Sequence, residues 1–501
     1  MALNCVALVR KFSAIHFALM GSPGSNIRSA TSPRAAAIVI LIQRRLTTGE
    51  QVKKKEAIAL VSAKDIRIVR FLYCDPSGVI RGKTVHGSQF AGKVTEGVGL
   101  TRAQNAVNLF EDLIPVDGME PIGEVRIIPD LDSLTILPWV DKTVGVFCDL
   151  MEQDGSEWGG CTRSVLKRAI SHAAELDIDV MAAFETEFYI AQEGPEGPVP
   201  WQNGPVYSSS GLDRASSVVY DIVDNLVAQG ITVEQAINEY GPGQQEIAIK
   251  YDKALRAADL HLKFRDTVRG TTEIQHGLLA SLAPKPFADG IGSGAHLHFS
   301  LWSKSKGINL LYNPDEPTKL SDFGKSFVAG VLDHLPALIA LTCPSYVSYH
   351  RLKPHSWAGN TISWGYDNRE CAVRVASPFT GREMESINLE LKACDGSTNP
   401  YLALAGLILA GLDGVKRNLQ PPAPAHRDPV FLTDQERAAC NIRPLPATQI
   451  EALAALEADS ILTEGLGELM TRAYLATRRA ENEKATRMGD EWARLNTFST
   501  F

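Results

Sequence analysis

The 501-residue sequence lacks paired cysteines, an excess of basic residues and long hydrophobic runs. Its eight cysteines stand singly with no Cys-x-x-Cys pair, which argues against a structural zinc site or a disulfide framework and favours a reducing compartment. The net charge of -8 argues against a nucleic-acid partner. No apolar run reaches the roughly 18 to 20 residues that a membrane span needs, so we expect no membrane segment.

Acidic residues are missing from residues 1–49, which hold arginine, lysine and serine instead. This composition resembles an organelle transit peptide. The simpler interpretation, which we favour, is a disordered extension or an over-called start site. We therefore expect a cytoplasmic protein, with import into an organelle as the alternative if this segment is a transit peptide.

Length and composition predict two domains after this extension. With 45% hydrophobic and 22% charged residues, the chain can bury a large core. We assign residues 1–50 to the extension or targeting-like segment, 51–142 to a small β-rich domain, and 143–501 to a large domain.

Local patterns predict that strands carry the chemistry and that helices lie outside them. Strands are predicted at residues 66–73, 79–85, 144–149 and 180–190, the first two joined by the turn Asp75-Pro76-Ser77-Gly78. Helices are predicted at residues 163–176, 215–229, 254–276 and 400–412, an amphipathic helical segment at 448–493, and a Pro/Gly-rich loop at 195–204. Because strands do not alternate regularly with helices, we expect an α+β fold with an antiparallel sheet.

Two pairs of potential metal ligands have the spacing of one strand face. Glu185 and Glu187, and likewise His296 and His298, are two residues apart, so each pair points to one side of an extended chain. Further candidates are Glu239, Glu246 and Glu390. Converging carboxylates raise each other's pKa unless cations neutralise them, so a divalent-metal site is the simplest interpretation.

Several sequence blocks around these residues occur together and in order. They are Glu185-Thr186-Glu187-Phe188, Gly243-Gln244-Gln245-Glu246-Ile247, Gly292-Ser293-Gly294-Ala295-His296-Leu297-His298, Arg351-Leu352-Lys353-Pro354, Asn368-Arg369 and Asn399-Pro400-Tyr401-Leu402. Each alone is weak, but in this order the chain resembles the glutamine synthetase family of the bacterial type I kind, from about residue 66 to the C-terminus.

The resemblance implies a β-grasp N-terminal domain and a catalytic domain shaped as an antiparallel split barrel with surrounding helices. It also implies a homo-oligomer, usually a dodecamer of two hexameric rings, with each active site between neighbouring subunits. The implied reaction is a ligation in which ATP phosphorylates the γ-carboxylate of glutamate and an amine then displaces the phosphate.

The resemblance also assigns metal ligands and phosphate-binding residues. The first metal ion would be held by Glu187, Glu239 and Glu246, and the second by Glu185, His296 and Glu390. Oxygen donors with one imidazole suit Mg²⁺ or Mn²⁺. Arg369 and Arg374 would stabilise the transferring phosphoryl group, because the guanidinium fork matches phosphate oxygens.

Further residues are assigned to the two substrates by the same resemblance. Ser300 and Arg374 would contact ATP, and His298 would contact ATP or glutamate. Gly292, Arg351 and Lys392 would contact glutamate, with Lys392 standing where the family has arginine and Arg351 also counted among the catalytic residues.

Two departures from the family concern the ammonium site. The N-terminal stretch 99–106 holds no aspartate, and its Arg102 would repel a cation. Six residues after Arg351, the family's flap carboxylate is replaced by Trp357. An indole offers an apolar face and no charge, which suits an alkyl or aromatic amine better than ammonium. Trp364 either adds to this amine pocket or packs in the core.

Three hypotheses follow from these assignments. The first is an ATP-dependent glutamate–amine ligase that makes a γ-glutamyl amide from an organic amine, namely an alkyl or aromatic monoamine. The second is a glutamine synthetase that takes its ammonium-binding acids from elsewhere. The third is a non-catalytic scaffold, which is disfavoured because it would not need the complete set of metal ligands and phosphate arginines.

Overall fold

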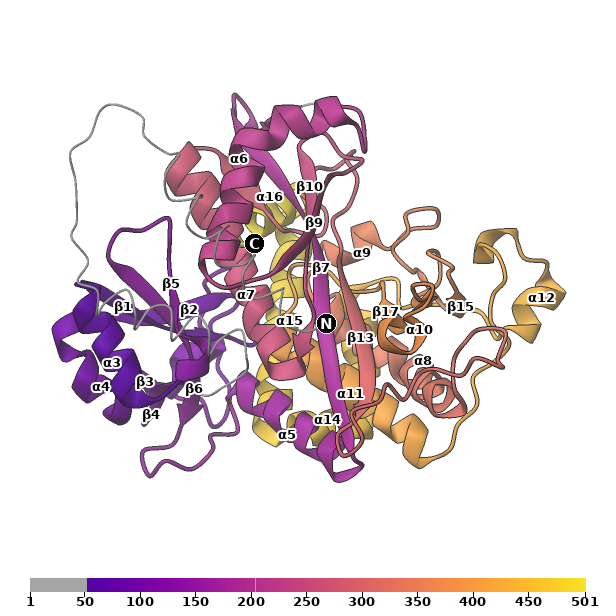
Figure 1. The fold of residues 1–501 in the computed structure, drawn as a ribbon, viewed down its shortest axis with the longest axis horizontal. Helices are drawn as coiled ribbons and strands as arrows, with labels where there is room; N and C mark the ends of the chain where they lie inside the picture. Colours follow the sequence, from indigo (N-terminus) through magenta and orange to yellow (C-terminus); the bar gives the residue numbers. More distant parts are fainter. Residues whose placement is uncertain (1–51, 203) are drawn as a thin grey trace, which may run out of the picture.

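The computed structural model describes residues 52–202 and 204–501, which form a small and a large domain (Figure 1). The predicted extension, residues 1–50, lies outside the described residues. Two helices accompany the sheet of the small domain, α3 (Lys54–Ala63) and α4 (Phe90–Glu96). Its strands run in the order β2-β1-β6-β4-β3, with β5 on β6. They are β1 (Ile68–Cys74), β2 (Ile80–His86), β3 (Val98–Thr101), β4 (Glu124–Pro129), β5 (Thr135–Ile136) and β6 (Thr143–Met151).

The predicted hairpin at the start of the small domain is confirmed. β1 and β2 pair in antiparallel register, and Asp75 closes the turn by accepting the Val79 backbone N–H through its carboxylate. Gly78 has a φ of +80°, which favours glycine, and a Cβ there would lie 2.6 Å from the carbonyl oxygen of Ser397. The turn therefore packs tightly against the large domain.

The small domain extends beyond the predicted boundary at residue 142. β6 lies between β1, to which it is parallel, and β4, to which it is antiparallel. It is thus a central strand of the small sheet, and assigning it to the large domain was wrong. Its pattern could not reveal this, because a central strand of either sheet is equally apolar.

The large domain is built on a ten-stranded, barrel-like sheet in the order β15-β16-β17-β13-β7-β10-β9, with β8, β11 and β12 also pairing with β7. Every pairing is antiparallel except that of β15 with β16. The strands are β7 (Ile178–Gly194), β8 (Gly197–Pro200), β9 (Val233–Asn238), β10 (Gln244–Ile249), β11 (Asp252–Lys253), β12 (Leu279–Ser281), β13 (Ala295–Ser303), β15 (Trp364–Tyr366), β16 (Val373–Ala376) and β17 (Asn388–Leu391). A separate pair joins β14 (Thr361–Ile362) to β18 (Arg443–Pro444).

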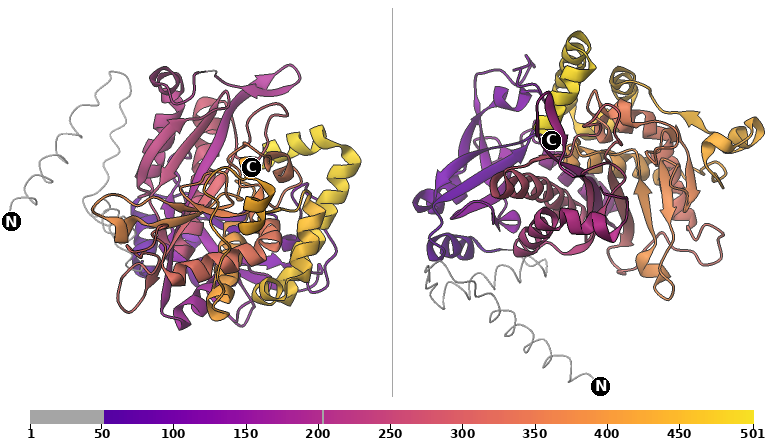
Figure 2. Two further views of the ribbon diagram at one scale, coloured as in Figure 1. Left: turned by 90° about the vertical axis from the view of Figure 1, so that its right-hand side faces the viewer. Right: turned by 90° about the horizontal axis from the view of Figure 1, so that it is seen from above.

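Helices surround this sheet, as Figures 1 and 2 show. They are α5 (Thr162–Glu175), α6 (Ser209–Ala228), α7 (Ala254–Gly270), α8 (Asp322–Thr342), α9 (Ser348–Arg351), α10 (Glu383–Ser386), α11 (Pro400–Lys416), α12 (Asp434–Ala439), α13 (Gln449–Ala458), α14 (Ser460–Leu466), α15 (Glu468–Met488) and α16 (Asp490–Thr500). The fold is therefore of the predicted α+β class, with an antiparallel barrel-like sheet inside a layer of helices.

Two local predictions in the large domain need correction. The Pro/Gly-rich loop contains a short strand, β8, which pairs with the C-terminal end of β7. Prolines are tolerated there because an edge strand need not donate every N–H. The helical segment after residue 448 consists of four helices, because Asp459 in an extended conformation and Gly467 and Gly489, with φ of 87° and 93°, interrupt it.

Helix α8, which the sequence pattern did not reveal, is a core helix. By length and hydropathy it could cross a membrane, yet 83% of its apolar window is buried inside the protein. It packs on α11, where Gly330 lies against Gly414, and a Cβ on Gly330 would approach the Gly414 nitrogen to 2.6 Å. The two glycines thus allow the helix backbones to approach closely.

We expect Gly330→Ala to destabilise the protein by about 1 to 3 kcal/mol, because the added methyl forces α8 away from α11. Gly92→Ala is the matched control, since a Cβ at this helical position meets no heavy atom within 4 Å. The control should be neutral or slightly stabilising. Equilibrium denaturation in urea checks both, and equal midpoints for the two variants would contradict the close helix contact.

Candidate active site

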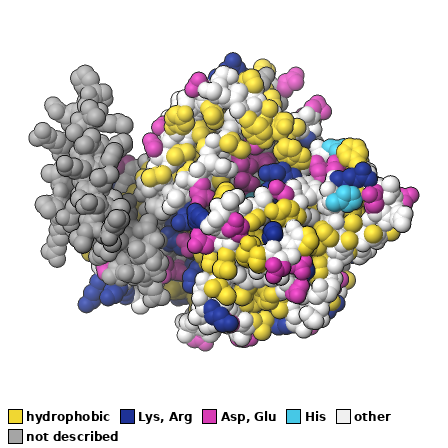
Figure 3. All heavy atoms as spheres, turned by 45° about the vertical axis from the view of Figure 1, so that its right-hand side comes forward, with side chains coloured by type: hydrophobic (Ala, Val, Ile, Leu, Met, Phe, Trp, Pro, Cys, Tyr) yellow, Lys and Arg dark blue, Asp and Glu magenta, His cyan; other side chains and the backbone are white. Residues whose placement is uncertain are grey.

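A cavity of about 560 Å³ lies over the sheet of the large domain. In Figure 3 acidic side chains gather in a recess beside Lys or Arg side chains, with apolar side chains around it. The predicted residues that line the cavity are Glu185, Glu187, Glu239, Glu246, Gly292, His296, His298, Arg351, Trp357, Arg369, Arg374, Glu390 and Lys392. The structure therefore brings together most of the site residues proposed from the sequence.

Strand register explains why residues distant in sequence meet here. His296 of β13 lies opposite Glu185 of β7, and Glu246 of β10 lies opposite Glu187. On the other side of β13, His298 lies opposite Glu390 of β17. Directly opposed residues of an antiparallel pair project to the same face of the sheet. One face of four adjacent strands thus carries all of these ligands.

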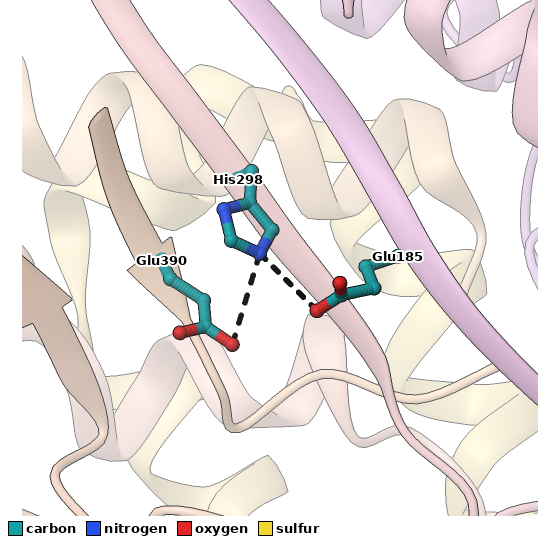
Figure 4. Close-up of side chains that lie close together, drawn as sticks. All are labelled: Glu185, His298 and Glu390. Atoms are coloured by element: carbon teal, nitrogen blue, oxygen red, sulfur yellow. Dashed lines mark hydrogen bonds and ion pairs between the residues drawn. The ribbon is translucent and has the colours of Figure 1, made fainter. Parts of the chain in front are cut away.

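The first group of ligand-type side chains is centred on Glu185 and Glu390 (Figure 4). The His298 Nε2 lies 3.4 Å from a Glu185 oxygen and 3.8 Å from a Glu390 oxygen. The His296 Nδ1 lies 3.6 Å and 3.4 Å from oxygens of the same two carboxylates. Both imidazoles therefore reach this group, as their spacing on one strand face predicted, whereas the family resemblance placed His298 at ATP or glutamate.

The second group of ligand-type side chains contains Glu187, Glu239 and Glu246. Glu187 accepts the Gly294 backbone N–H at 2.8 Å and the Gln244 side-chain amide at 3.1 Å. Glu239 accepts its neighbouring N–H at 3.1 Å. These contacts orient the carboxylates without neutralising them, because each donor is uncharged.

The pKa values of the second group are raised, since buried carboxylates face one another. Burial raises the pKa of Glu187 to about 7. Burial and the charges of Glu185, Glu187 and Glu239 raise the pKa of Glu246 to about 10. Burial also raises the pKa of Glu239. In the first group the opposite holds for Glu185, whose pKa is lowered by its two histidines against the opposing effect of burial.

Two divalent cations fit this donor set. Five carboxylates and two imidazoles surround one cavity, and among the residues that the structure describes no cationic side chain is in hydrogen-bond contact with the carboxylates of the second group. Oxygen-rich sites with one or two imidazoles suit Mg²⁺ or Mn²⁺, and bound cations would relieve the repulsion that raises the carboxylate pKa values.

Cationic side chains also line the cavity, and two of them contact Glu390 of the first group. Arg374 donates to Glu390 at 3.0 Å and to Asp367 at 2.6 Å, and Lys392 contacts Glu390 at 3.1 Å. Arg369 lies nearby with about half of its side chain exposed (52%) and 4.0 Å from Asp367. Since Arg369 is hardly engaged, its guanidinium is available to a bound anion.

Arg351 and Gly292 lie side by side, as expected for two residues that are predicted to contact the same glutamate. Arg351 is buried and donates to the backbone carbonyls of Cys394 and Lys392 at 3.2 Å and 3.3 Å. A Cβ on Gly292 would lie 2.7 Å from the Arg351 Cγ. Glycine is therefore needed for the close approach of these two segments.

Three predicted residues do not line the cavity. Ser300 continues the same face of β13 but is buried, and its Oγ accepts the Trp302 indole N–H at 2.9 Å. Arg102 lies in the small domain and pairs with Glu152 at 2.6 Å. Trp364 is buried and donates to the Pro422 carbonyl at 2.8 Å, so its placement in an amine pocket was wrong and core packing is correct.

Sequence reasoning missed an aromatic cluster at the cavity, formed by Tyr207, Tyr240 and Trp357. The rings of Tyr207 and Tyr240 meet edge to face at 5.5 Å, and those of Tyr240 and Trp357 at 5.8 Å. The Tyr207 hydroxyl lies 3.4 Å from the Glu239 carboxylate. Tyr240 directly follows Glu239 and could have been noticed, but nothing in the sequence marks Tyr207.

Comparison with known proteins gives matches along almost the whole chain. The glutamine synthetase N-terminal domain family matches residues 55–158, and the glutamine synthetase catalytic domain family matches residues 159–496. The γ-glutamylpolyamine synthetase GlnA3 of Streptomyces coelicolor is 35% identical over 86% of this chain and 93% of its own length. The glutamine synthetase of Mycobacterium tuberculosis is 32% identical over 86% of this chain and 95% of its own length.

Solved structures give the same result. A GmaS/ADP complex superimposes with a TM-score of 0.76 at 30% identity, covering 88% of this chain and 98% of the other. The structure of a novel glutamine synthase homolog gives a TM-score of 0.76 at 30% identity, covering 86% of this chain and 98% of the other.

We expect the affinity of the metal-free protein for Mn²⁺ to rise with pH, by up to about tenfold per pH unit for each displaced proton. Glu187 and Glu246 have raised pKa values, so near pH 6 a bound cation must displace their protons. Calorimetric titration in two buffers of different ionisation enthalpy measures the affinity and the proton release.

Glu246→Gln should weaken this binding and reduce the proton release. Glu234→Gln, which alters an exposed carboxylate on β9 outside the cavity, should change neither. A metal affinity independent of pH in the unmodified protein would contradict the protonation of the carboxylates in the second group.

Proposed function

The chain belongs to the glutamine synthetase family, and from this premise we propose that it makes γ-glutamyl amides from glutamate and an organic amine. As a member of this family it is an ATP-dependent ligase that forms C–N bonds. What remains to be proposed is the acceptor, which we take to be a monoamine with an alkyl or aromatic substituent.

The aromatic cluster carries this proposal. Trp357 stands where the family resemblance expects a carboxylate, and its indole lines the cavity beside Tyr240. Ile291, exposed by 50%, adds an aliphatic side chain to the same cavity. Aromatic and aliphatic surfaces gain free energy by covering an alkyl or aryl group, and ammonia has no such group to cover.

The residues of the cavity divide the reaction between them. Arg351 would pair with the α-carboxylate of glutamate, next to the backbone of Gly292. Arg369 and Arg374 would neutralise the phosphoryl group as it passes to the γ-carboxylate. The first group, which includes His296, would hold one cation, and the second group would hold the other. When bound, the two cations neutralise negative charge on the triphosphate.

Amide formation also requires a proton acceptor, because the amine loses a proton when it attacks. Glu239 is the cavity carboxylate in contact with the aromatic cluster, through the Tyr207 hydroxyl. We therefore propose Glu239 as the acceptor of the proton that the amine loses.

Three further parts complete the proposal. The metal ion is proposed to be Mg²⁺ or Mn²⁺. The oligomer is proposed to be a dodecamer of two hexameric rings, in which Arg102 of one subunit would face the active site of its neighbour. The location is proposed to be the cytoplasm.

Ammonia is the second candidate acceptor, favoured by the glutamine synthetases among the relatives. A polyamine is a third, because one relative is named a γ-glutamylpolyamine synthetase. We rank it below a monoamine, since Trp357, Tyr240 and Ile291 give the cavity an aromatic and aliphatic surface. A non-catalytic scaffold is disfavoured, because the ligands and arginines converge in one cavity.

We expect an alkyl or aromatic monoamine to be used at least about tenfold more efficiently than ammonia, by burying its apolar group against the aromatic cluster. Phosphate release from ATP and glutamate across ammonia, alkylamines, anilines and polyamines, with mass detection of the product, measures this. Ammonia as the best acceptor would show that the protein is a divergent glutamine synthetase.

Trp357→Glu should raise the catalytic efficiency with ammonia and lower that with the preferred amine, each by about tenfold or more, because it exchanges an apolar surface for a negative charge. Ile450→Glu introduces the same charge at an exposed position on α13, outside the cavity, and should change neither. Unchanged ammonia turnover in the Trp357 variant would favour the second hypothesis, in which acidic residues elsewhere in the protein bind ammonium.

A further inference from the structure

The segment that carries Trp357 is tied down by side chains that lie outside the cavity. We propose that Asp428 and Glu370 are positioning residues that hold residues 353–359, here called the flap, and thereby set which amine the Trp357 indole admits. The selectivity part of this inference rests on the proposed function. Neither Asp428 nor Glu370 lines the cavity, so both would act through the flap.

The flap has an unusual backbone that needs external support. His355 and Trp357 have φ values of 57° and 52°, and Gly359 has 66°. Side-chain-bearing residues adopt left-handed conformations only when the surroundings hold them there. Two such residues in three positions make the direction of the indole dependent on the contacts of this segment.

Asp428 supplies one of these contacts. One of its oxygens lies 3.0 Å from the His355 Nδ1, and its other oxygen accepts the Val430 backbone N–H at 2.9 Å. The His355 ring also packs on Phe431, with centroids 5.3 Å apart. The Asp428 side chain is only 18% exposed. His355 is thus held between a fixed carboxylate and an aromatic ring.

Glu370 supplies the second contact. Its carboxylate faces the backbone N–H of Trp357 itself, and it lies with His355 and Asp428 in one cluster whose polar atoms are within 4.8 Å of each other. Both ends of the strained stretch are therefore contacted, His355 through its side chain and Trp357 through its backbone.

These contacts connect the flap to the phosphate-binding arginine. Asn368 donates to the carbonyls of Ala425 and Arg427, both at 3.0 Å, which fixes the loop bearing Asp428. Arg369, between Asn368 and Glu370, lines the cavity. The same short segment thus positions Arg369 on one side and the flap on the other.

Across the cavity, Trp357 meets Tyr240 in the loop between β9 and β10, with ring planes at 89°. An edge-to-face contact of this kind is sensitive to the orientation of both rings. If the flap were released, the indole could leave Tyr240 and the cavity would lose its apolar side. Loss of selectivity for the amine, with retained binding of ATP, is the expected consequence.

The test compares Asp428→Asn and Glu370→Gln with Asp434→Asn, a matched change at an exposed carboxylate on α12. We expect the first two to raise the KM for the preferred amine and to lower its efficiency relative to ammonia by about tenfold, with the KM for ATP within about twofold. Asp434→Asn should change none of these. His355→Gln replaces either variant that does not fold.

A double-mutant cycle separates positioning from a general structural effect. In a Trp357→Ala background, Asp428→Asn should no longer change the ratio of amine to ammonia efficiency, because the indole through which it acts is gone. An undiminished effect in that background would overturn the proposal, as would an unchanged ratio in the unmodified background.

Hydrogen exchange of the flap amides distinguishes this inference from the proposed function. In the Asp428→Asn and Glu370→Gln variants the amides of residues 353–359 should exchange faster than in the Asp434→Asn variant. Equal rates would contradict the role of Asp428 and Glu370 in holding the flap. If the unmodified protein turns over ammonia alone, the proposed acceptor is wrong. In that case the exchange rates alone test whether Asp428 and Glu370 hold the flap.

Discussion

Electrostatic repulsion among buried carboxylates is the constraint on which the rest of the site depends. Glu187, Glu239 and Glu246 share one cavity, and their pKa values are all raised. Such a group is unfavourable in a folded protein unless protons or cations compensate it. The surrounding strands must therefore be rigid enough to hold the groups together, and the tight pairing of β7 with β10 and β13 provides this rigidity.

The ligand pairs could be predicted because strand geometry is periodic. Residues two apart share a face, so Glu185 with Glu187 and His296 with His298 follow from the sequence alone. Which strands lie next to each other does not follow from periodicity. The family resemblance supplied this, and it also supplied Glu390, whose partner in register, His298, is distant in sequence.

Other features could not be predicted because they depend on tertiary contacts. Trp357 and Trp364 are seven residues apart and alike in type, yet one lines the cavity and the other is buried. Trp357 has a left-handed backbone, which the sequence does not predict for a tryptophan, because this conformation is uncommon outside glycine, asparagine, aspartate and histidine. β6 was misassigned for a related reason, since an apolar run does not reveal the sheet in which it is buried.

Strand β7 runs through 17 residues and bears both Glu185 and Glu187. Because its side chains alternate between cavity and core, one inserted residue near its middle would send a carboxylate into the hydrophobic interior. At its far end, where it turns into β8 between Gly194 and Gly197, the chain carries no cavity residue. Changes in length during evolution should therefore accumulate at that hairpin and be absent from the middle of β7, whatever amine the cavity has come to accept.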